Sequence, residues 1–114
     1  MRIIKESRLK EFIHDHPKAR KMLERWTRLT RKALWTKFKD VRDTFPDADE
    51  VAVVSGKKAM VFDISGNDFR LITAVHYMKP ELQEGKKRWV NGRVYIFYFL
   101  THAEYDKNAW KETL

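Results

Sequence analysis

Side chains that could do acid–base chemistry follow directly after the last long apolar run of the chain, in "VYIFYFLTHAEYD" (94–106). The imidazole of His102 exchanges protons near neutral pH, and the phenol of Tyr105 can orient a substrate or donate a proton. An alternative interpretation is structural, because "THAE" matches the capping box, with Thr101 as the N-cap of a helix and Glu104 as its partner. The two interpretations are compatible, since the cap fixes the backbone and leaves other side chains free for chemistry.

A second set of candidates lies on the strand predicted for "NDFRLITAVHY" (67–77), where side chains alternate between the two faces of a sheet. One face is expected to carry Phe69, Leu71, Thr73, Val75 and Tyr77, and the other Arg70, Ile72, Ala74 and His76. If the first set packs on the helices, Arg70 and His76 face outward from an open sheet face. They stand about 20 Å apart at strand rise, so they cannot hold the same phosphate.

Arg70 is the stronger candidate for binding phosphate, because a guanidinium can grip it through two parallel hydrogen bonds. The alternative for Arg70 is a cross-strand ion pair with Asp63 or Asp68. The alternative for His76 is a purely structural role. The start of a helix also attracts anions through its free N–H groups and its dipole. A histidine and a tyrosine at that point, with an arginine on a neighbouring strand, could suit a phosphodiester.

The elements that must position these residues begin with helices. The "RIIK" stretch (2–5) could add one short strand, and Ser7 is predicted to cap a first helix that ends at "HDHP" (14–17). The next helix ends before "FPDAD" (45–49) and carries one continuous apolar stripe. The stripe is formed by Ala19, Met22, Leu23, Trp26, Leu29, Ala33 and Leu34.

From Glu50 onward the apolar period changes to two, which is typical of strands. The stretch "VAVVSGKKAMVFDI" (51–64) predicts two short strands around a turn, or a hairpin with Lys57 and Lys58 at its tip. An Asn91–Gly92 pair favours a two-residue hairpin turn before the last and longest strand. A short helix closes the chain. Helices followed by an antiparallel meander predict an α+β fold with the N-terminal helices on one face of the sheet.

Length and composition bound the class of protein. At 114 residues, with 43% hydrophobic content, the chain is expected to form one folded domain over residues 1–114. It has no cysteine, so it has no disulfide framework and no thiolate metal site. No apolar run reaches the roughly 20 residues that cross a bilayer, and the start does not read as a signal peptide. We expect a cytoplasmic protein without membrane contact or cofactor.

Charge indicates the kind of partner. The formal net charge is +8 and the sequence pI is about 9.8, which is typical of proteins that meet a polyanion, although simple solubility is the alternative. On the second predicted helix, one stripe of like charges is formed by Lys18, Lys21, Arg25, Arg28 and Lys32. The stripe predicts a face that contacts phosphates, for example those of ribosomal RNA, with Arg25 and Arg28 as candidates. The alternative is a solvated face opposite the apolar stripe.

The order of the motifs "FPDADEV … VFDISGNDFRLITAVHY … RVYI … THAEYDKNAW" resembles the HigB family of toxins from bacterial type II toxin–antitoxin pairs. The resemblance covers most of the chain from Phe45 to Trp110, and "GNDFRLI" and "THAEYD" are its most specific parts. Before Phe45 the chain matches only in being short and helical. The resemblance implies a compact RelE-like fold, ribosome-dependent cleavage of messenger RNA, and neutralisation by a helix-turn-helix (HigA-like) antitoxin.

Two departures from the family pattern stand out. The family often carries a basic residue where this chain has Phe97, so one positive contact to RNA is absent or comes from elsewhere. The segment "MKPELQEGKKRWVNG" (78–92) is longer than the family leads us to expect, and its basic run beside Trp89 could bind RNA, because bases stack on indole rings. An extended surface hairpin is the alternative. The RNA contacts expected in this half of the chain are Lys57, Lys58, Lys86, Lys87, Arg88 and Arg93.

The implied reaction uses the 2′-OH of the RNA as nucleophile, and no Asp/Glu cluster resembles a two-metal site, which favours a metal-independent route. Arg70 is expected to stabilise the phosphate, while His102 and Tyr105 share proton transfer and orientation. A tyrosine with a pKa of about 10 is a poor base, so Tyr105 is preferred as an orienting or acid group. Two other functions remain open: a non-catalytic nucleic-acid-binding module, and a degenerate toxin that acts only through its antitoxin.

Overall fold

The secondary structure follows the predicted order, with helices first and strands after them. The computed structural model describes residues 1–114. The helices are α1 (Ser7–Asp15), α2 (Arg20–Lys32), α3 (Phe38–Thr44) and α4 (His102–Asp106), with short 3₁₀ segments η1 (Pro17–Ala19) and η2 (Ala109–Glu112). The strands are β1 (Arg2–Ile4), β2 (Asp49–Ala52), β3 (Lys58–Ile64), β4 (Phe69–His76), β5 (Lys79–Gln83), β6 (Lys86–Val90) and β7 (Arg93–Thr101). None of the helices is long and apolar enough to cross a lipid bilayer.

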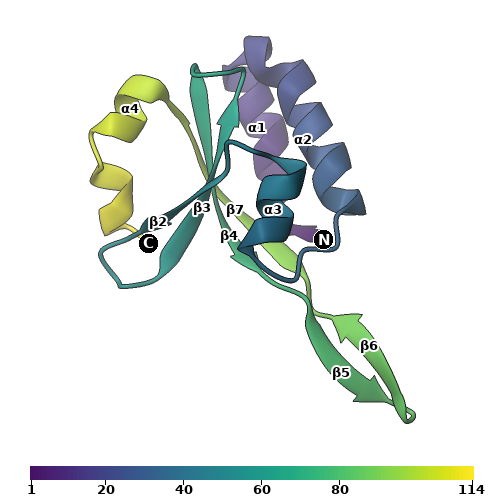
Figure 1. Cartoon of the computed structure of the whole chain (residues 1–114). Coiled ribbons are helices and arrows are strands. Elements are labelled where there is room, and N and C mark those ends of the chain that lie inside the picture. Colours follow the sequence, from purple (N-terminus) through teal and green to yellow (C-terminus); the bar gives the residue numbers. More distant parts are fainter.

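Five strands form one sheet in the order β1-β7-β4-β3-β2 (Figure 1). Strands β7, β4, β3 and β2 run antiparallel to their neighbours, as the meander predicts, and the α+β class is confirmed. β1 is the exception, since it pairs in parallel with β7 and places Ile3 opposite Val94. The short N-terminal strand therefore exists, but the sheet is mixed rather than wholly antiparallel.

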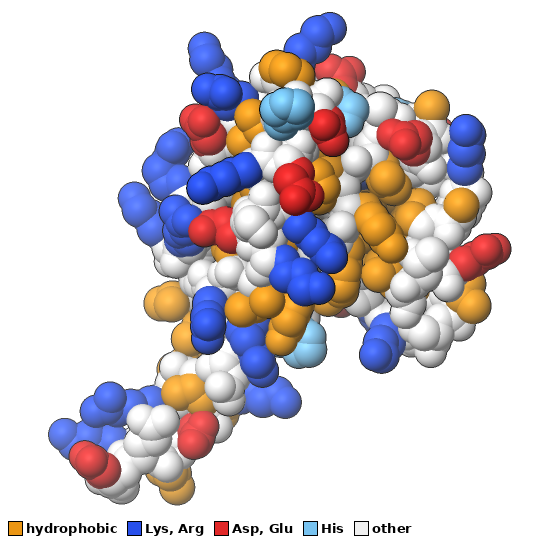
Figure 2. Space-filling view, turned by 180° about the vertical axis from the view of Figure 1, so that it is seen from behind, with side chains coloured by type: hydrophobic (Ala, Val, Ile, Leu, Met, Phe, Trp, Pro, Cys, Tyr) orange, Lys and Arg blue, Asp and Glu red, His pale blue; other side chains and the backbone are white.

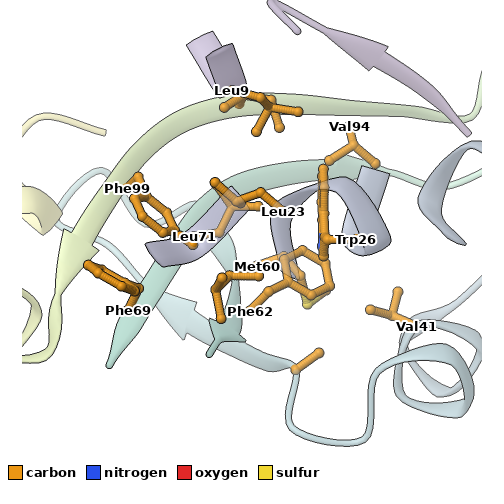
Figure 3. Packing of buried hydrophobic residues seen from close by; sticks show 14 of the residues in the cluster. Leu9, Leu23, Trp26, Val41, Met60, Phe62, Phe69, Leu71, Val94 and Phe99 are labelled. Atoms are coloured by element: carbon orange, nitrogen blue, oxygen red, sulfur yellow. The ribbon is translucent and has the colours of Figure 1, made fainter. Parts of the chain in front are cut away.

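Helices α1, α2 and α3 pack on one face of this sheet and enclose the main core. Trp26 of α2 lies against Phe62 of β3 with ring centroids 5.4 Å apart, and Phe69 of β4 stacks on Phe99 of β7 at 4.8 Å (Figure 3). Phe69 and Leu71 of β4 both belong to this core. The predicted helix-facing side of β4 is therefore confirmed.

The opposite face of the sheet is not open, contrary to the prediction. The segment after Thr101 folds across it, and Trp110 of η2, only 5% exposed, packs there with Val61 and Ile72 in a second, smaller core. Arg70 lies on this covered face and is 9% exposed. The prediction was wrong because it gave the C-terminal segment only a short helix and did not place that segment on the sheet. Water reaches only the second half of this face of β4, where His76 is exposed.

A two-stranded hairpin formed by β5 and β6 projects from the body of the molecule as an arm (Figure 1). Its turn is Glu84–Gly85, whose φ angles of 52° and 76° are both positive, as a type I′ turn requires. The predicted turn at Asn91–Gly92 is wrong, because only Asn91 has a positive φ, 67°. That pair instead joins β6 to β7 at the root of the arm.

The helix boundaries also differ from those that the sequence pattern predicts. Ser7 is not a cap, because Glu6 is the N-cap of α1 and no side chain caps that end. α2 ends at Lys32, where the backbone of Ala33 becomes extended, and Leu34 at the end of the predicted stripe is 72% exposed. The break lets Trp35 turn into the core, where it is 1% exposed.

Candidate active site

The capping box at the start of α4 is present as predicted. The backbone N–H of Glu104 donates to Oγ1 of Thr101 at 3.2 Å, and the backbone N–H of Thr101 donates to Oε1 of Glu104 at 3.0 Å. The second of these bonds is the main cause that lowers the pKa of Glu104. The N–H of His102 donates to the carbonyl of Asp68 at 3.0 Å. The start of α4 is therefore largely satisfied by the protein itself, and it is not the open anion site that was expected.

His102 is an accessible titratable group at the start of α4. Its Nδ1 lies 2.9 Å from Oδ2 of Asp106, one helical turn further along α4, and its side chain is 44% exposed. The carboxylate of Asp106 therefore lies beside Nδ1, and Nε2 is the nitrogen left to face a substrate. Asp106 itself is 59% exposed, so the pair lies at the surface.

Tyr105 lies between an indole and a guanidinium. Its ring stacks on Trp110 with centroids 5.3 Å apart, and the guanidinium carbon of Arg70 is 5.6 Å from the centre of the phenol ring. Burial is the main cause that raises the pKa of Tyr105, with a further contribution from the charge of Asp49. The phenol therefore keeps its proton across the neutral range, which fits an orienting or donating role and not a base.

Arg70 forms the predicted alternative contact, the cross-strand ion pair. Its Nε lies 3.1 Å from Oδ1 of Asp63, the residue directly opposite on β3. Its Nη1 donates to the carbonyls of Asn67 and Phe69 at 3.2 Å and 3.1 Å, and its Nη2 donates to Oδ1 of Asn67. The ion pair and these three hydrogen bonds hold the guanidinium within the chain, so the expectation of an outward-facing phosphate clamp is wrong.

These contacts link Arg70 to the start of α4. The guanidinium binds Asn67 in the turn between β3 and β4, and the next residue in that turn, Asp68, accepts the N–H of His102. Burial raises the pKa of Asp63, while the charges of Arg70 and of His102 both act to lower it, because both lie near this carboxyl group. The Arg70 guanidinium therefore lies against the ring of Tyr105 and near the start of α4, which carries His102; that the three side chains form one catalytic site stays a prediction.

His76 does not join this cluster. It lies at the far end of β4, where its ring meets that of Tyr95 edge-on at 5.1 Å. The predicted separation of His76 from Arg70 therefore holds.

The predicted RNA-binding residues occupy three separate surfaces. Arg25 and Arg28 are exposed on α2; Lys57 and Lys58 are exposed before and at the start of β3; the basic residues of β6 are exposed on the arm. Figure 2 shows Lys and Arg side chains on the arm and along the edge of the body that carries the N-terminal helices. Arg93, at the start of β7, differs from the others because its Nε is buried without a hydrogen-bond partner.

Sequence reasoning missed three residues of the cluster. Asp106 was seen only as a carboxylate after a strand, although its spacing of four residues from His102 predicts contact on a helix. Asn67 could not be found from the sequence, because its role depends on the conformation of a turn. Trp110 carries a recognisable signal, an aromatic residue after the helix, but its position over the sheet follows only from the tertiary fold.

Comparison with known proteins agrees with the resemblance seen in the motifs. A family model described as HigB toxin, the RelE-like toxic component of a toxin–antitoxin system, matches residues 19–108. The match includes α2, so it extends further towards the N-terminus than the motifs indicate. No curated protein matches the sequence closely enough to count as a relative. Because the match covers most of the chain and includes α4, the chain belongs to the HigB toxin family, the RelE-like toxic component of a toxin–antitoxin system.

Proposed function

We propose that this toxin is a ribosome-dependent endoribonuclease that cleaves messenger RNA at the α4 cluster and so inhibits translation. The observation that supports this most directly is the accessible imidazole of His102, held by Asp106 beside the partly buried phenol of Tyr105. A histidine with one nitrogen held by a carboxylate and the other free is a common arrangement for proton transfer.

In the proposed reaction the 2′-OH of the RNA attacks the adjacent phosphorus, and the bond from phosphorus to the 5′ oxygen breaks. Nε2 of His102 accepts the proton of the 2′-OH. Tyr105 keeps its proton and donates a hydrogen bond to the phosphate or to the leaving 5′ oxygen. That oxygen takes its proton from water, and His102 later returns the proton that it accepted to the solvent. The products are a 2′,3′-cyclic phosphate and a 5′-hydroxyl, and no metal takes part in any step.

Arg70 acts in this scheme mainly as a positioning residue. Its contacts with Asn67 and Phe69 fix the turn that holds the N–H of His102, and its guanidinium lies against the ring of Tyr105. Its positive charge and the N–H groups without an acceptor are what it offers to a phosphate. A full two-bond grip would require it to leave Asp63.

The basic surfaces serve the substrate and the ribosome. Phosphates of messenger RNA and ribosomal RNA meet the exposed lysines and arginines of α2 and of the arm, where affinity is electrostatic and decreases with salt. Because the substrate is on the ribosome, the protein acts in the cytoplasm. As a member of a toxin family, the chain has an antitoxin as a partner, and we propose a helix-turn-helix (HigA-like) protein for that role.

A degenerate toxin, which would act only through its antitoxin, is the second candidate. Two features favour a degenerate toxin: the guanidinium of Arg70 is paired with Asp63, and Phe97 is uncharged. Each leaves one cation fewer to stabilise charge on a phosphate.

Inducible expression with mapping of cellular RNA 5′ ends separates the two. New 5′ ends within translated codons, together with growth arrest that a co-expressed antitoxin reverses, support the nuclease. Growth arrest without new 5′ ends, or unchanged growth, would favour the degenerate toxin. The matched variant is His102→Ala, which keeps the capping box intact, because Thr101 and Glu104 supply both of its bonds.

A further inference from the structure

A groove lies on the same sheet face as the α4 cluster, but at the opposite end of β4. Its volume is about 710 Å³. The C-terminal segment separates it from the cluster, since Thr113 and Leu114 border it and Trp110 packs on the sheet behind them. The six-residue step from Arg70 to His76 corresponds to about 20 Å along an extended strand. The groove is therefore a separate site from the proposed reaction centre.

The groove is hollow because small side chains form its floor. Ala59 of β3 and Ala74 of β4 both line it, and they continue their strands just beyond the paired residues Met60 and Thr73. A β-bulge in the pairing of β4 with β7 adds Phe97 as an extra residue on β7. A bulge re-aims neighbouring side chains, and here both Tyr95 and Phe97 border the groove.

The walls combine rings with positive charge. His76 and Tyr95 meet edge-on at 5.1 Å, and Phe97 is partly exposed beside them. Lys57 and Lys58 form the other side, and no Asp or Glu side chain lines the groove. Rings that offer a flat face, next to cations without a competing carboxylate, are complementary to a nucleotide, with its planar base and its phosphate.

We infer that this groove is a base-stacking subsite for single-stranded RNA, which binds a nucleotide several positions away from the cleaved one. The inference rests on the proposed function for its substrate, but its site is distinct. A base stacks on Tyr95 or Phe97 over the alanine floor, and Lys57 and Lys58 contact the phosphates. In this chain a ring at Phe97 thus binds RNA by stacking, where a basic residue would bind it by charge.

The position of the groove at the root of the arm supports the same ligand. His76 ends β4 just before the arm, and Tyr95 lies in β7 just after it. RNA that leaves the groove in this direction meets the exposed basic residues of β6 and the half-exposed Trp89, which Lys87 contacts at 5.8 Å from its ring centre. Rings and cations therefore continue along one path from the groove to the arm.

Photochemical crosslinking tests the location of the site. An oligouridylate of about ten nucleotides that carries 5-iodouridine is irradiated with the purified protein, both alone and as the message of programmed ribosomes. Mass spectrometry then identifies the adducts. The inference expects adducts on His76, Tyr95 or Phe97 in at least one of the two settings. Adducts confined to other residues, or none in either setting, would overturn it.

Substitutions test whether stacking is the cause. Phe97→Ala removes a ring, and Ala74→Leu fills the floor; each is expected to weaken binding of the oligouridylate at least about fivefold. The controls are Phe97→Tyr, which keeps a ring, and Ala74→Ser, which keeps a small side chain on the floor of the groove. An abasic oligomer of equal length should bind all five proteins, wild type included, with the same affinity, because it has only phosphates. Thermal unfolding identifies any variant whose loss comes from misfolding.

The outcomes separate this inference from the proposed function. If the wild type cleaves RNA but Phe97→Ala and Ala74→Leu bind the oligouridylate unchanged, the groove is not a base subsite and the nuclease stands. If both variants lose affinity for the oligouridylate but wild-type protein cleaves nothing, the subsite stands and the nuclease fails. If both variants lose affinity only for the antitoxin, the groove is a protein-docking surface and the inference is wrong.

Discussion

Two substitutions of Tyr105 separate its chemical role from its structural role. The ring stacks on Trp110 and lies against the guanidinium of Arg70. The hydroxyl group makes no hydrogen bond within the chain and is not buried, so it reaches solvent. Tyr105→Phe keeps the ring and removes only the hydroxyl. Tyr105→Ala removes both. Only the second change should affect the fold, while both should affect the chemistry.

The expected magnitudes follow from these contacts. Tyr105→Ala loses an aromatic stack worth about 0.5–1.5 kcal/mol and a cation–π contact worth about 0.5–1 kcal/mol, together with some ring burial. We expect the free energy of unfolding to decrease by about 2 kcal/mol, which a folded domain tolerates. For Tyr105→Phe we expect a change within about 0.5 kcal/mol. If the phenol takes part in proton transfer or orientation, its loss should slow cleavage by about 100-fold.

Two assays on the same preparations give the comparison. Urea denaturation measures the free energy of unfolding, and cleavage of a defined message on programmed ribosomes measures the rate. Tyr105→Phe that unfolds like the wild type and cleaves within about threefold of its rate would show that Tyr105 is only a structural ring. If Tyr105→Ala leaves the free energy of unfolding unchanged, the contacts of the Tyr105 ring with Trp110 and Arg70 contribute little to stability.

Three further predictions follow from single contacts. Asp106→Asn should slow cleavage about tenfold or more, with stability within about 0.5 kcal/mol of wild type because the ion pair is exposed; an unchanged cleavage rate would remove Asp106 from the mechanism. Thr101→Ala should lower the free energy of unfolding by about 1 kcal/mol through loss of the cap, whereas Thr101→Ser should retain it, as urea titration can check. Burial raises the pKa of Tyr77 to about 12, so its protonated form contributes stability below pH 10, the unfolded value, and this is lost as pH rises towards 12. Tyr77→Phe should therefore lose less stability than wild type between pH 8 and pH 12, and equal losses would contradict the assignment.

The parts of the fold that local patterns determine could be predicted from the sequence. The capping box at Thr101 and Glu104 depends on four consecutive residues, and the two faces of β4 depend on simple alternation. Both were confirmed. The pairing of Arg70 with Asp63 was foreseen as an alternative, because both lie on neighbouring antiparallel strands.

The parts that failed depend on contacts between distant segments. Asn91–Gly92 has the composition of a hairpin turn, yet Glu84–Gly85 forms the turn, because the register of β5 and β6 decides which pair sits at the tip. The burial of Arg70 depends on Trp110, which reaches the sheet only after α4 has reversed the chain. β1 pairs in parallel with β7, a contact between the two ends of the chain that no local pattern encodes.

The chemical identity of the RNA ends tests the central proposal most directly. Purified toxin is added to programmed ribosomes, and the fragments of the message are examined for their termini, in parallel with His102→Ala. We predict wild-type fragments with a 5′-hydroxyl and a 2′,3′-cyclic phosphate, and a loss of cleavage of about 100-fold or more for His102→Ala. Fragments with a 5′-phosphate, or His102→Ala protein that cleaves at the wild-type rate, would contradict the account.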